Sequence, residues 1–369
     1  MHKILLLKFQ RRKFMKKVFK FMALVLCCAI TLSFAGLFGG CGRQTKKVGI
    51  LMPSTKEQRW TQDSDNLKRQ LQAKGYTVEI KNAEDDADKQ ISQIDAMIDG
   101  GFDVLVICAH DSTKLAAVLQ KAAGKGIKII AYDRLIMDSG NVDYYVTFDN
   151  FEVGRLQGEH IETALNLKNA SGPFNIELFA GAATDNNALF FFDGAMSVLQ
   201  QYIDNGKLAV PSGETERTTV AAAGWDYPLA KERMDRLLLE NYADGTELHA
   251  VLSPNDGIAQ ALIPSLKAAG FADMPILTGQ DSEKESVKKI IAGEQAMTVF
   301  KDTRALADRT FKMVEDLLLG NTPETNDTKT YHNGVKTLPT YMCKPVGVTK
   351  ANYVEILIDS GYYELSDLQ

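Results

Sequence analysis

The sequence lacks the motifs by which most catalytic and nucleotide-binding sites are recognised. It contains no G-x-x-x-x-G-K-[ST] loop and no G-x-G-x-x-G turn opening a helix, which argues against a cradle for nucleotide phosphates. H-E-x-x-H, C-x-x-C and G-x-S-x-G are also absent, and with them the usual signs of zinc peptidases, thiol redox enzymes and serine hydrolases. A D-x-[DN]-x-[DN]-G loop is missing too, so we expect no bound calcium, no other metal and no cofactor. These absences favour a binding protein over an enzyme.

Cysteine is scarce, with five in the whole chain. Cys27 and Cys28 lie in an N-terminal segment that we expect to be removed, and Cys41 directly follows it. Cys108 and Cys343 remain, and an oxidising compartment would allow a disulfide between them, although sequence alone does not establish one. A plain buried thiol is the preferred interpretation of Cys108.

Acidic residues are missing from the first forty positions, which hold eight Lys and Arg. A basic stretch leads into an apolar one, residues 21–38, which is the order typical of an export signal. We therefore predict that residues 1–40 are a signal peptide, with translation starting at Met1 or Met15. Without its eight cations the formal net charge falls from -5 to -13, and so acidic a body is not expected to bind nucleic acid.

Small residues stand directly before Cys41, as in a bacterial lipoprotein processing site. We expect cleavage there, a lipid on Cys41 and a tether over residues 41–46. The alternative is an uncleaved membrane anchor. Both place the rest of the chain outside the cytoplasm, held at a membrane.

The remaining chain alternates between short apolar runs and amphipathic helical patterns, and the alternation restarts after Asn150. It predicts an α/β fold with two doubly wound, Rossmann-like lobes, each built on a parallel sheet with helices on both faces. The strands are expected at residues 48–52, 77–81, 104–107, 128–131, 174–179, 208–210, 250–252, 276–278 and 296–300. From about residue 321 the pattern becomes an irregular tail.

The stretch from Gly126 to Gly154 gives the clearest indication of function. Its apolar run ends abruptly in Asp133 and Arg134, at the carboxyl end of a predicted buried strand. Ligands of open α/β sheets bind outside those ends, so these two side chains are expected to hold a small polar ligand. A structural ion pair between them is the alternative. Residues 148–150, after the next apolar run, are predicted to cross between the lobes.

Polar side chains follow the other predicted strands as well. They are Lys56, Glu57, Arg59 and Trp60; His110 and Asp111; Asp185, Asn186 and Asn187; Asn255 and Asp256; Gln280 and Asp281; and Lys301 and Asp302. Asp256 and Asp302 are interpreted as ordinary helix N-caps, and Lys56 and Glu57 could equally form a solvated loop. Trp60 and Trp225 stand in predicted loops, where a flat ring beside hydrogen-bonding groups suits a sugar.

These segments carry a family resemblance. From Lys47 to about Tyr353 the chain resembles the type I periplasmic sugar-binding proteins of ABC transporters, most closely the xylose-binding and multiple-monosaccharide-binding receptors. The matching segments are VGILMPSTKEQRW, GIKIIAYDRLI with YYVTFDNFEVG, GAATDNNALFFFDGAM, SPNDGIA, TGQDSE and TVFKD.

The resemblance implies two lobes joined by three hinge crossings, with the ligand in the cleft between them. Residues 47–148 plus 302–335 would form the N-terminal lobe, and residues 149–301 plus 336–369 the C-terminal lobe. The third crossing would lie between Tyr331 and Thr340. The implied ligand-binding residues are Arg59, Trp60, Asp133 and Arg134 from the first lobe, and Asn186, Asn187, Trp225, Asn255, Asp281 and Lys301 from the second.

The resemblance also implies a function. We expect a monomeric, extracytoplasmic receptor without catalytic activity that captures a monosaccharide by lobe closure and delivers it to an ABC transporter permease. The calcium loop of the glucose and galactose receptor is absent, which favours xylose, glucose or a broader aldose range over strict galactose. The alternatives are a sugar sensor that signals through a membrane histidine kinase or a chemoreceptor of chemotaxis, and an extracytoplasmic sugar-modifying enzyme.

Overall fold

The computed structural model describes residues 11, 12, 14–18, 20, 22, 45–271 and 273–369. The chain divides into two units, Met1–Thr45 and Lys46–Gln369, and the second is the folded body considered below. Most of the predicted signal peptide and the predicted lipidation site, Cys41, lie outside the described residues. Among the helices that are described, none has both the length and the apolar character needed to span a membrane.

The first lobe is built on a six-stranded parallel sheet with the strand order β11-β5-β4-β3-β1-β2. Its strands are β1 (Lys47–Met52), β2 (Thr77–Asn82), β3 (Val104–Ile107), β4 (Lys128–Tyr132), β5 (Tyr144–Phe148) and β11 (Thr340–Cys343). Its helices are α2 (Gln58–Ala73), α3 (Ala87–Asp99), α4 (Ala116–Gly124) and α10 (Thr303–Leu319).

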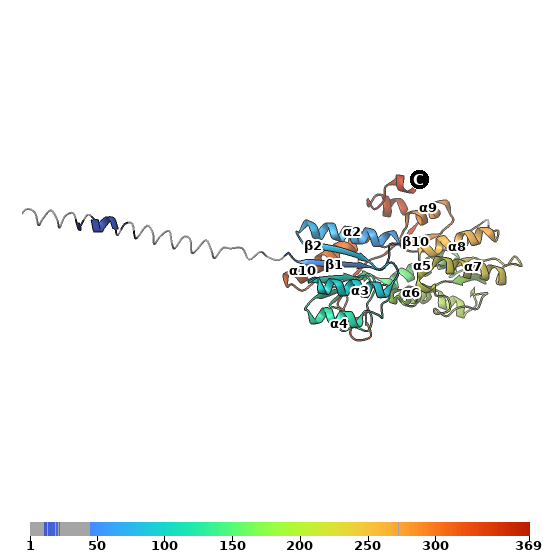
Figure 1. Ribbon diagram of the computed structural model, residues 1–369. Coiled ribbons are helices and arrows are strands. Elements are labelled where there is room, and N and C mark those ends of the chain that lie inside the picture. The colour runs from blue at the N-terminus through green and yellow to red at the C-terminus, as the bar shows by residue number, and fades with distance from the viewer. Residues whose placement is uncertain (1–10, 13, 19, 21, 23–44, 272) are drawn as a thin grey trace, which may run out of the picture. The chain divides into compact units, whose positions relative to one another are not determined.

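Helices cover both faces of this sheet (Figure 1). Successive residues of a strand point to opposite faces, so Ile50 of β1 packs in one apolar cluster with α2 and α10, and Leu51 packs in another with α3 and α4. A strand buried on both faces needs an unbroken apolar run, which is why VGILM and VLVI are recognisable in the sequence.

The second lobe repeats this plan around a four-stranded parallel sheet with the order β7-β6-β8-β9. Its strands are β6 (Phe174–Leu178), β7 (Leu208–Ala209), β8 (Ala250–Leu252) and β9 (Ile276–Leu277), followed by an antiparallel pair of β10 (Met297–Phe300) and β12 (Val346–Thr349). Its helices are α5 (Asn150–Ala164), α6 (Asn186–Asp204), α7 (Tyr227–Asn241), α8 (Asp256–Ala268) and α9 (Lys284–Ala292), with short turns at Ala223–Trp225, Val354–Ile358 and Leu365–Leu368. The predicted fold class is confirmed.

The chain passes between the lobes where β5 leads into α5, β10 into α10 and β11 into β12, at residues 148–150, 300–303 and 343–346. The third crossing lies later than predicted, because β11 pairs with β5 in the first sheet, with Thr340 beside Tyr145. Residues before it also contact the first lobe, since the Asn333 side chain donates to the Ile136 carbonyl oxygen. The predicted boundary at residue 335 is therefore too early. A strand of four residues whose partner lies almost two hundred positions away carries no local signal.

The structure also bears on the predicted cysteine states and helix caps. Cys108 and Cys343 are buried and unpaired within the described part of the chain, so the disulfide that the compartment would allow is not formed. Burial raises the pKa of the Cys343 thiol to about 12. Asp302 caps α10 as predicted, but the N-cap of α8 is Asn255 rather than Asp256.

Helices α5 and α6 approach so closely that no side chain fits between them. A Cβ atom added to Gly154 would lie 1.8 Å from the carbonyl oxygen of Phe191, and one added to Gly194 would lie 2.1 Å from that of Phe151. The close approach continues at Gly158, where an added Cβ atom would lie 2.8 Å from the carbonyl oxygen of Ala195. Since α5 directly follows the first crossing, this contact fixes where the second lobe begins.

We predict that Gly154→Ala lowers the free energy of unfolding by about 2 kcal/mol or more, because the added methyl collides with backbone that cannot move aside. Gly124→Ala is the matched control. Gly124 ends α4, and a methyl group added there would meet nothing within 4 Å, so alanine should be neutral or slightly stabilising. Urea unfolding followed by circular dichroism measures both variants, and equal stabilities would contradict this account of the α5–α6 contact.

Candidate ligand-binding site

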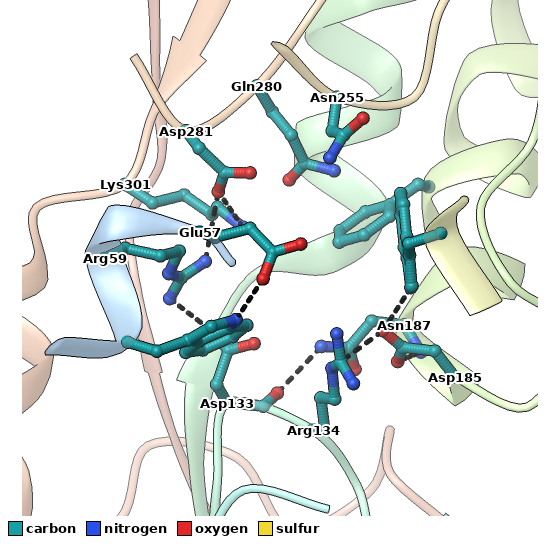
Figure 2. Close-up of a pocket in the computed structure, with 13 residues that line it drawn as sticks. Glu57, Arg59, Asp133, Arg134, Asp185, Asn187, Asn255, Gln280, Asp281 and Lys301 are labelled. Atoms are coloured by element: carbon teal, nitrogen blue, oxygen red, sulfur yellow. Dashed lines mark hydrogen bonds and ion pairs between the residues drawn. The ribbon is translucent and has the colours of Figure 1, made fainter. Parts of the chain in front are cut away.

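A pocket lies between the lobes, at the carboxyl ends of both parallel sheets (Figure 2). Its empty volume, which includes solvent at the open mouth, is about 350 Å³. The lining residues are Glu57, Arg59, Trp60, Asp133, Arg134, Asp185, Asn187, Phe191, Trp225, Asn255, Gln280, Asp281 and Lys301.

All the predicted ligand-binding residues except Asn186 line this pocket. Asn186 is the first residue of α6 and half-buried, whereas Asn187 is buried and donates through Nδ2 to the Asp133 carbonyl oxygen at 2.8 Å. Successive residues of a helix point in different directions, so only one of this pair can face the cleft.

The structure adds four lining residues to the predicted set, namely Glu57, Asp185, Phe191 and Gln280. Three of them follow strands and were noted as polar strand ends, so a stricter use of that rule would have included them. Phe191 lies on α6 inside an apolar run, and nothing in the sequence separates it from a core residue.

A buried charge network centred on Arg59 occupies one side of the pocket. Its guanidinium pairs with Asp133 at 2.6 Å and with Asp281, from the other lobe, at 3.0 Å. Lys301 lies 2.8 Å from the same Asp281 oxygen (Figure 2). Burial opposes ionisation of Asp281, but Lys301 and Arg59 outweigh it and lower the pKa of the carboxyl. The pocket therefore presents fixed charges of both signs.

A second network lies at the opposite side. Arg134 does not pair with its neighbour Asp133; its Nε contacts Asp185 of the second lobe at 3.0 Å. Asp185 also caps α6 by accepting from the Asn187 backbone N–H at 3.0 Å. The predicted alternative of a local ion pair between Asp133 and Arg134 is therefore wrong.

Two indole rings supply apolar surface. Trp60 is in the first turn of α2 rather than in a loop, with the Arg59 guanidinium 4.4 Å from its ring centroid. Trp225 ends a short 3₁₀ turn, and its ring covers Gly181, where a Cβ would lie 2.2 Å from the ring. Any residue but glycine at position 181 would displace this wall.

The backbone at the site is strained. Asp133, Trp225 and Asp281 have φ values of 58°, 56° and 96°, which L-residues other than Asn and Asp seldom adopt. Such conformations persist only where the surroundings enforce them, and they cluster at functional sites. Here they turn each side chain out of its strand or turn and into the cleft.

Two amide side chains of the pocket have a donor or an acceptor atom without a hydrogen-bond partner among the described residues. Asn255 accepts from Ile258 N–H through Oδ1, but its Nδ2 has no acceptor there. Gln280 donates to the Pro254 carbonyl oxygen at 2.7 Å, while its Oε1 is buried without a partner. Buried polar groups normally find partners, so these atoms are suited to bind a ligand with hydroxyl groups. Among the residues that are described, no group of three or more His, Cys, Asp or Glu could hold a metal ion.

Comparisons with known proteins agree with this geometry. A family model for the periplasmic binding protein domain matches residues 48–322. The chain is 53% identical over 326 residues to the multiple sugar-binding periplasmic receptor ChvE of Rhizobium radiobacter, covering 87% of this chain and 92% of that protein. It is 32% identical over 349 residues to the D-xylose-binding periplasmic protein of Escherichia coli K12, covering 95% and 99%. An ABC transporter solute binding protein of Clostridium phytofermentans, solved with bound β-D-glucose, matches with a TM-score of 0.86 and 48% identity over 88% of this chain and 100% of that one.

One buried carboxyl stands behind the pocket. Asp63 on α2 has no solvent exposure, and its Oδ2 is 3.6 Å from Arg59. Burial raises the pKa of Asp63 to about 7, although Arg59 acts in the opposite direction. The ordinary pKa of an aspartate in an unfolded chain is about 4.

We predict that stability depends on pH through Asp63. A raised pKa stabilises the fold fully below about pH 4, and this contribution is lost as the pH rises towards 7. Asp63→Asn removes the titration, so its stability relative to wild type should rise by about 2 kcal/mol between pH 5 and 8. Asp99→Asn is the control: hydrogen bonds from Lys125 and Lys121 lower the pKa of this exposed carboxyl, so it is ionised in both the folded and the unfolded chain above pH 5 and its effect on stability should not change across this range. Urea titrations across this pH range measure both, and a flat difference for Asp63→Asn would contradict the prediction.

Proposed function

Because this chain belongs to the periplasmic binding protein family, as its sequence segments predicted, we propose that it is an extracytoplasmic receptor for a monosaccharide. The observation that carries the proposal is the pocket between the lobes, where charged, amide and aromatic side chains from both sheets converge. Its ligand is an aldose, with xylose, glucose or a broader range as the candidates. The sugars named for the similar proteins support this range.

The chemistry of the lining suits a sugar ring. The C–H faces of a pyranose are apolar and would stack on Trp60 and Trp225, while its rim carries hydroxyl groups. Carboxylates such as Asp133 accept from hydroxyl groups, and Arg134 and Lys301 donate to hydroxyl and ring oxygens. Hydrogen bonds to ionised groups are about twice as strong as neutral ones, which compensates for the small size of the ligand.

Lobe closure belongs to the mechanism. A hexose has about twelve non-hydrogen atoms, and a micromolar Kd corresponds to about -8 kcal/mol. This requires about -0.7 kcal/mol per atom, within the range of about -0.3 to -1.5 that small ligands reach when they are well buried. The lobes are closed in this structure, since Arg59 reaches Asp281 and Arg134 reaches Asp185 across the cleft. Such closure around a ligand at a hinge is the usual motion of two-lobed binding proteins.

We further propose that the monomeric protein delivers its sugar to an ABC transporter permease and catalyses no reaction. The description of a similar solved structure as an ABC transporter solute binding protein supports delivery to a permease. A sensory role through a membrane histidine kinase or chemoreceptor would use the same closed form, and deletion of the permease separates the two. If the protein serves transport, sugar uptake should stop when the permease is deleted. If it serves sensing, the cellular response to the sugar should persist without the permease.

The sugar-binding proposal predicts that calorimetry with D-xylose or D-glucose shows a heat of binding and a micromolar Kd. Asn255→Ala should weaken binding at least tenfold, because it removes the Nδ2 donor of the pocket. This substitution also removes the cap of α8, so Asp86→Ala, which removes the cap of α3 away from the pocket, is the matched control and should bind as the wild type does. Absence of heat with every aldose tested would refute sugar binding, and unaltered affinity in Asn255→Ala would remove Asn255 from the site.

The lipid anchor is a separate proposal that rests on the sequence before Cys41. Cys41→Ser should move the protein from the membrane fraction to the released fraction and abolish incorporation of labelled fatty acid. Cys343→Ser, at a buried thiol of the folded body, is the control and should leave both unchanged. Membrane association that survives Cys41→Ser would favour the uncleaved anchor instead.

A further inference from the structure

The two tryptophans of this chain face the same pocket from different lobes, and a carboxylate holds the indole N–H of each. Trp60 Nε1 donates to Glu57 Oε2 at 2.7 Å, and Trp225 Nε1 donates to Asp185 Oδ2 at 3.2 Å. Both carboxylates are buried. The same arrangement therefore occurs once in each lobe.

Each of these carboxylates also has a partner across the cleft. Glu57 Oε1 accepts from the hydroxyl of Tyr227, in the second lobe, at 3.0 Å. Asp185 Oδ2 lies 3.0 Å from Nε of Arg134, in the first lobe (Figure 2). Each carboxylate thus links the aromatic wall of its own lobe to a donor on the opposite lobe.

Other contacts join the same two segments. The Lys56 ammonium group donates to the Trp225 carbonyl oxygen at 2.8 Å and lies 4.0 Å from the ring centroid of Tyr227. The loop before α2 and the turn before α7 are therefore held together by three contacts directly beside the two tryptophans. When the lobes separate, all three contacts are lost.

A buried carboxylate is costly unless its oxygens are satisfied, and each further donor lowers that cost. Within its own lobe Glu57 also accepts from the Ser54 hydroxyl at 3.1 Å, and Asp185 from the Asn187 N–H at 3.0 Å. Closure supplies a third donor to each carboxylate. The closed form therefore holds both indole rings more firmly than an open form can, and a sugar that selects closure gains rigid walls on which to stack.

We propose that Glu57 and Asp185 are positioning residues that couple the orientation of the two tryptophan rings to lobe closure, through Tyr227 and Arg134 respectively. This inference rests on the proposed sugar-binding function and deepens it. It assigns to Tyr227, which does not line the pocket, a role in how long the sugar stays bound.

Tyr227→Phe is the cleanest test, because it removes one hydroxyl and leaves both the ring and the Trp60–Glu57 bond in place. In stopped-flow fluorescence with D-glucose or D-xylose, koff should rise about tenfold, the expected effect of losing a hydrogen bond to a charged group. The association rate should change by less than about threefold, because the contact forms only after encounter. The double variant Glu57→Gln, Tyr227→Phe should release sugar no faster than Glu57→Gln alone. Both substitutions act on the same hydrogen bond, between the Tyr227 hydroxyl and the Glu57 side chain.

Tyr242→Phe is the matched control. The Tyr242 hydroxyl donates to Glu177 Oε1 at 2.8 Å, a buried tyrosine–carboxylate bond of the same kind that stays inside the second lobe. This variant should lose stability and keep the wild-type koff. An equal rise of koff in both variants would reduce the Tyr227 effect to general destabilisation and overturn the inference.

Fluorescence of single-tryptophan proteins adds a readout that a merely structural role would not move. With Trp60 as the sole tryptophan, in Trp225→Phe at saturating sugar, Tyr227→Phe should red-shift the emission and lower its anisotropy, since the ring is held less firmly. Unchanged emission with unchanged koff would overturn the inference while leaving sugar binding intact. A wild-type protein that binds no aldose would overturn the proposed function, and this inference with it.

Discussion

The pairing of Arg59 with carboxylates from both lobes is the constraint on which the site depends. A buried guanidinium is tolerated only where carboxylates compensate its charge, and here Asp133 comes from its own lobe and Asp281 from the other. Lys301, directly after a hinge strand, shares Asp281. The cluster is therefore complete only when the lobes meet, which links the electrostatics of the pocket to its closure.

This constraint explains how so many charged groups can line one buried pocket. The pairs Arg59–Asp133 and Lys301–Asp281 do not cross the cleft, so they fix donors and acceptors before a ligand arrives and little ordering is needed on binding. The left-handed backbone at Asp133, Trp225 and Asp281 turns those side chains inward, and Gly181 leaves room for the ring of Trp225. Away from the pocket, the glycines of α5 and α6 let the two helices pack closely, and this contact sets the position of the second lobe after the first crossing.

Much of this arrangement could be predicted from the sequence, and the exceptions share a cause. Apolar runs that end in Asp, Asn, Arg or Lys identified most of the pocket, because the ends of parallel strands meet at one edge. β11 was missed because its partner, β5, is distant in sequence. Of the residues on α6, Phe191 lines the pocket without having been predicted and Asn186 does not line it, because which face of α6 turns towards the cleft depends on how α6 packs. The Asp256 carboxylate is buried and accepts hydrogen bonds from Gln295 and Thr298 instead of capping α8. These donors lie about forty positions away in the sequence, so no local pattern indicates them.

The sequence by itself determined the strand and helix alternation, the two-lobed plan and the kinds of side chain that face the cleft, because these follow from hydrophobic periodicity and from local turn chemistry. Only the tertiary structure decided which of those side chains pair with one another. Asp133 and Arg134 are adjacent in the chain, yet each finds its partner elsewhere, since oppositely charged groups pair with whatever the fold brings within reach. The pairs that cross the cleft come from segments far apart in sequence, and no local pattern encodes them.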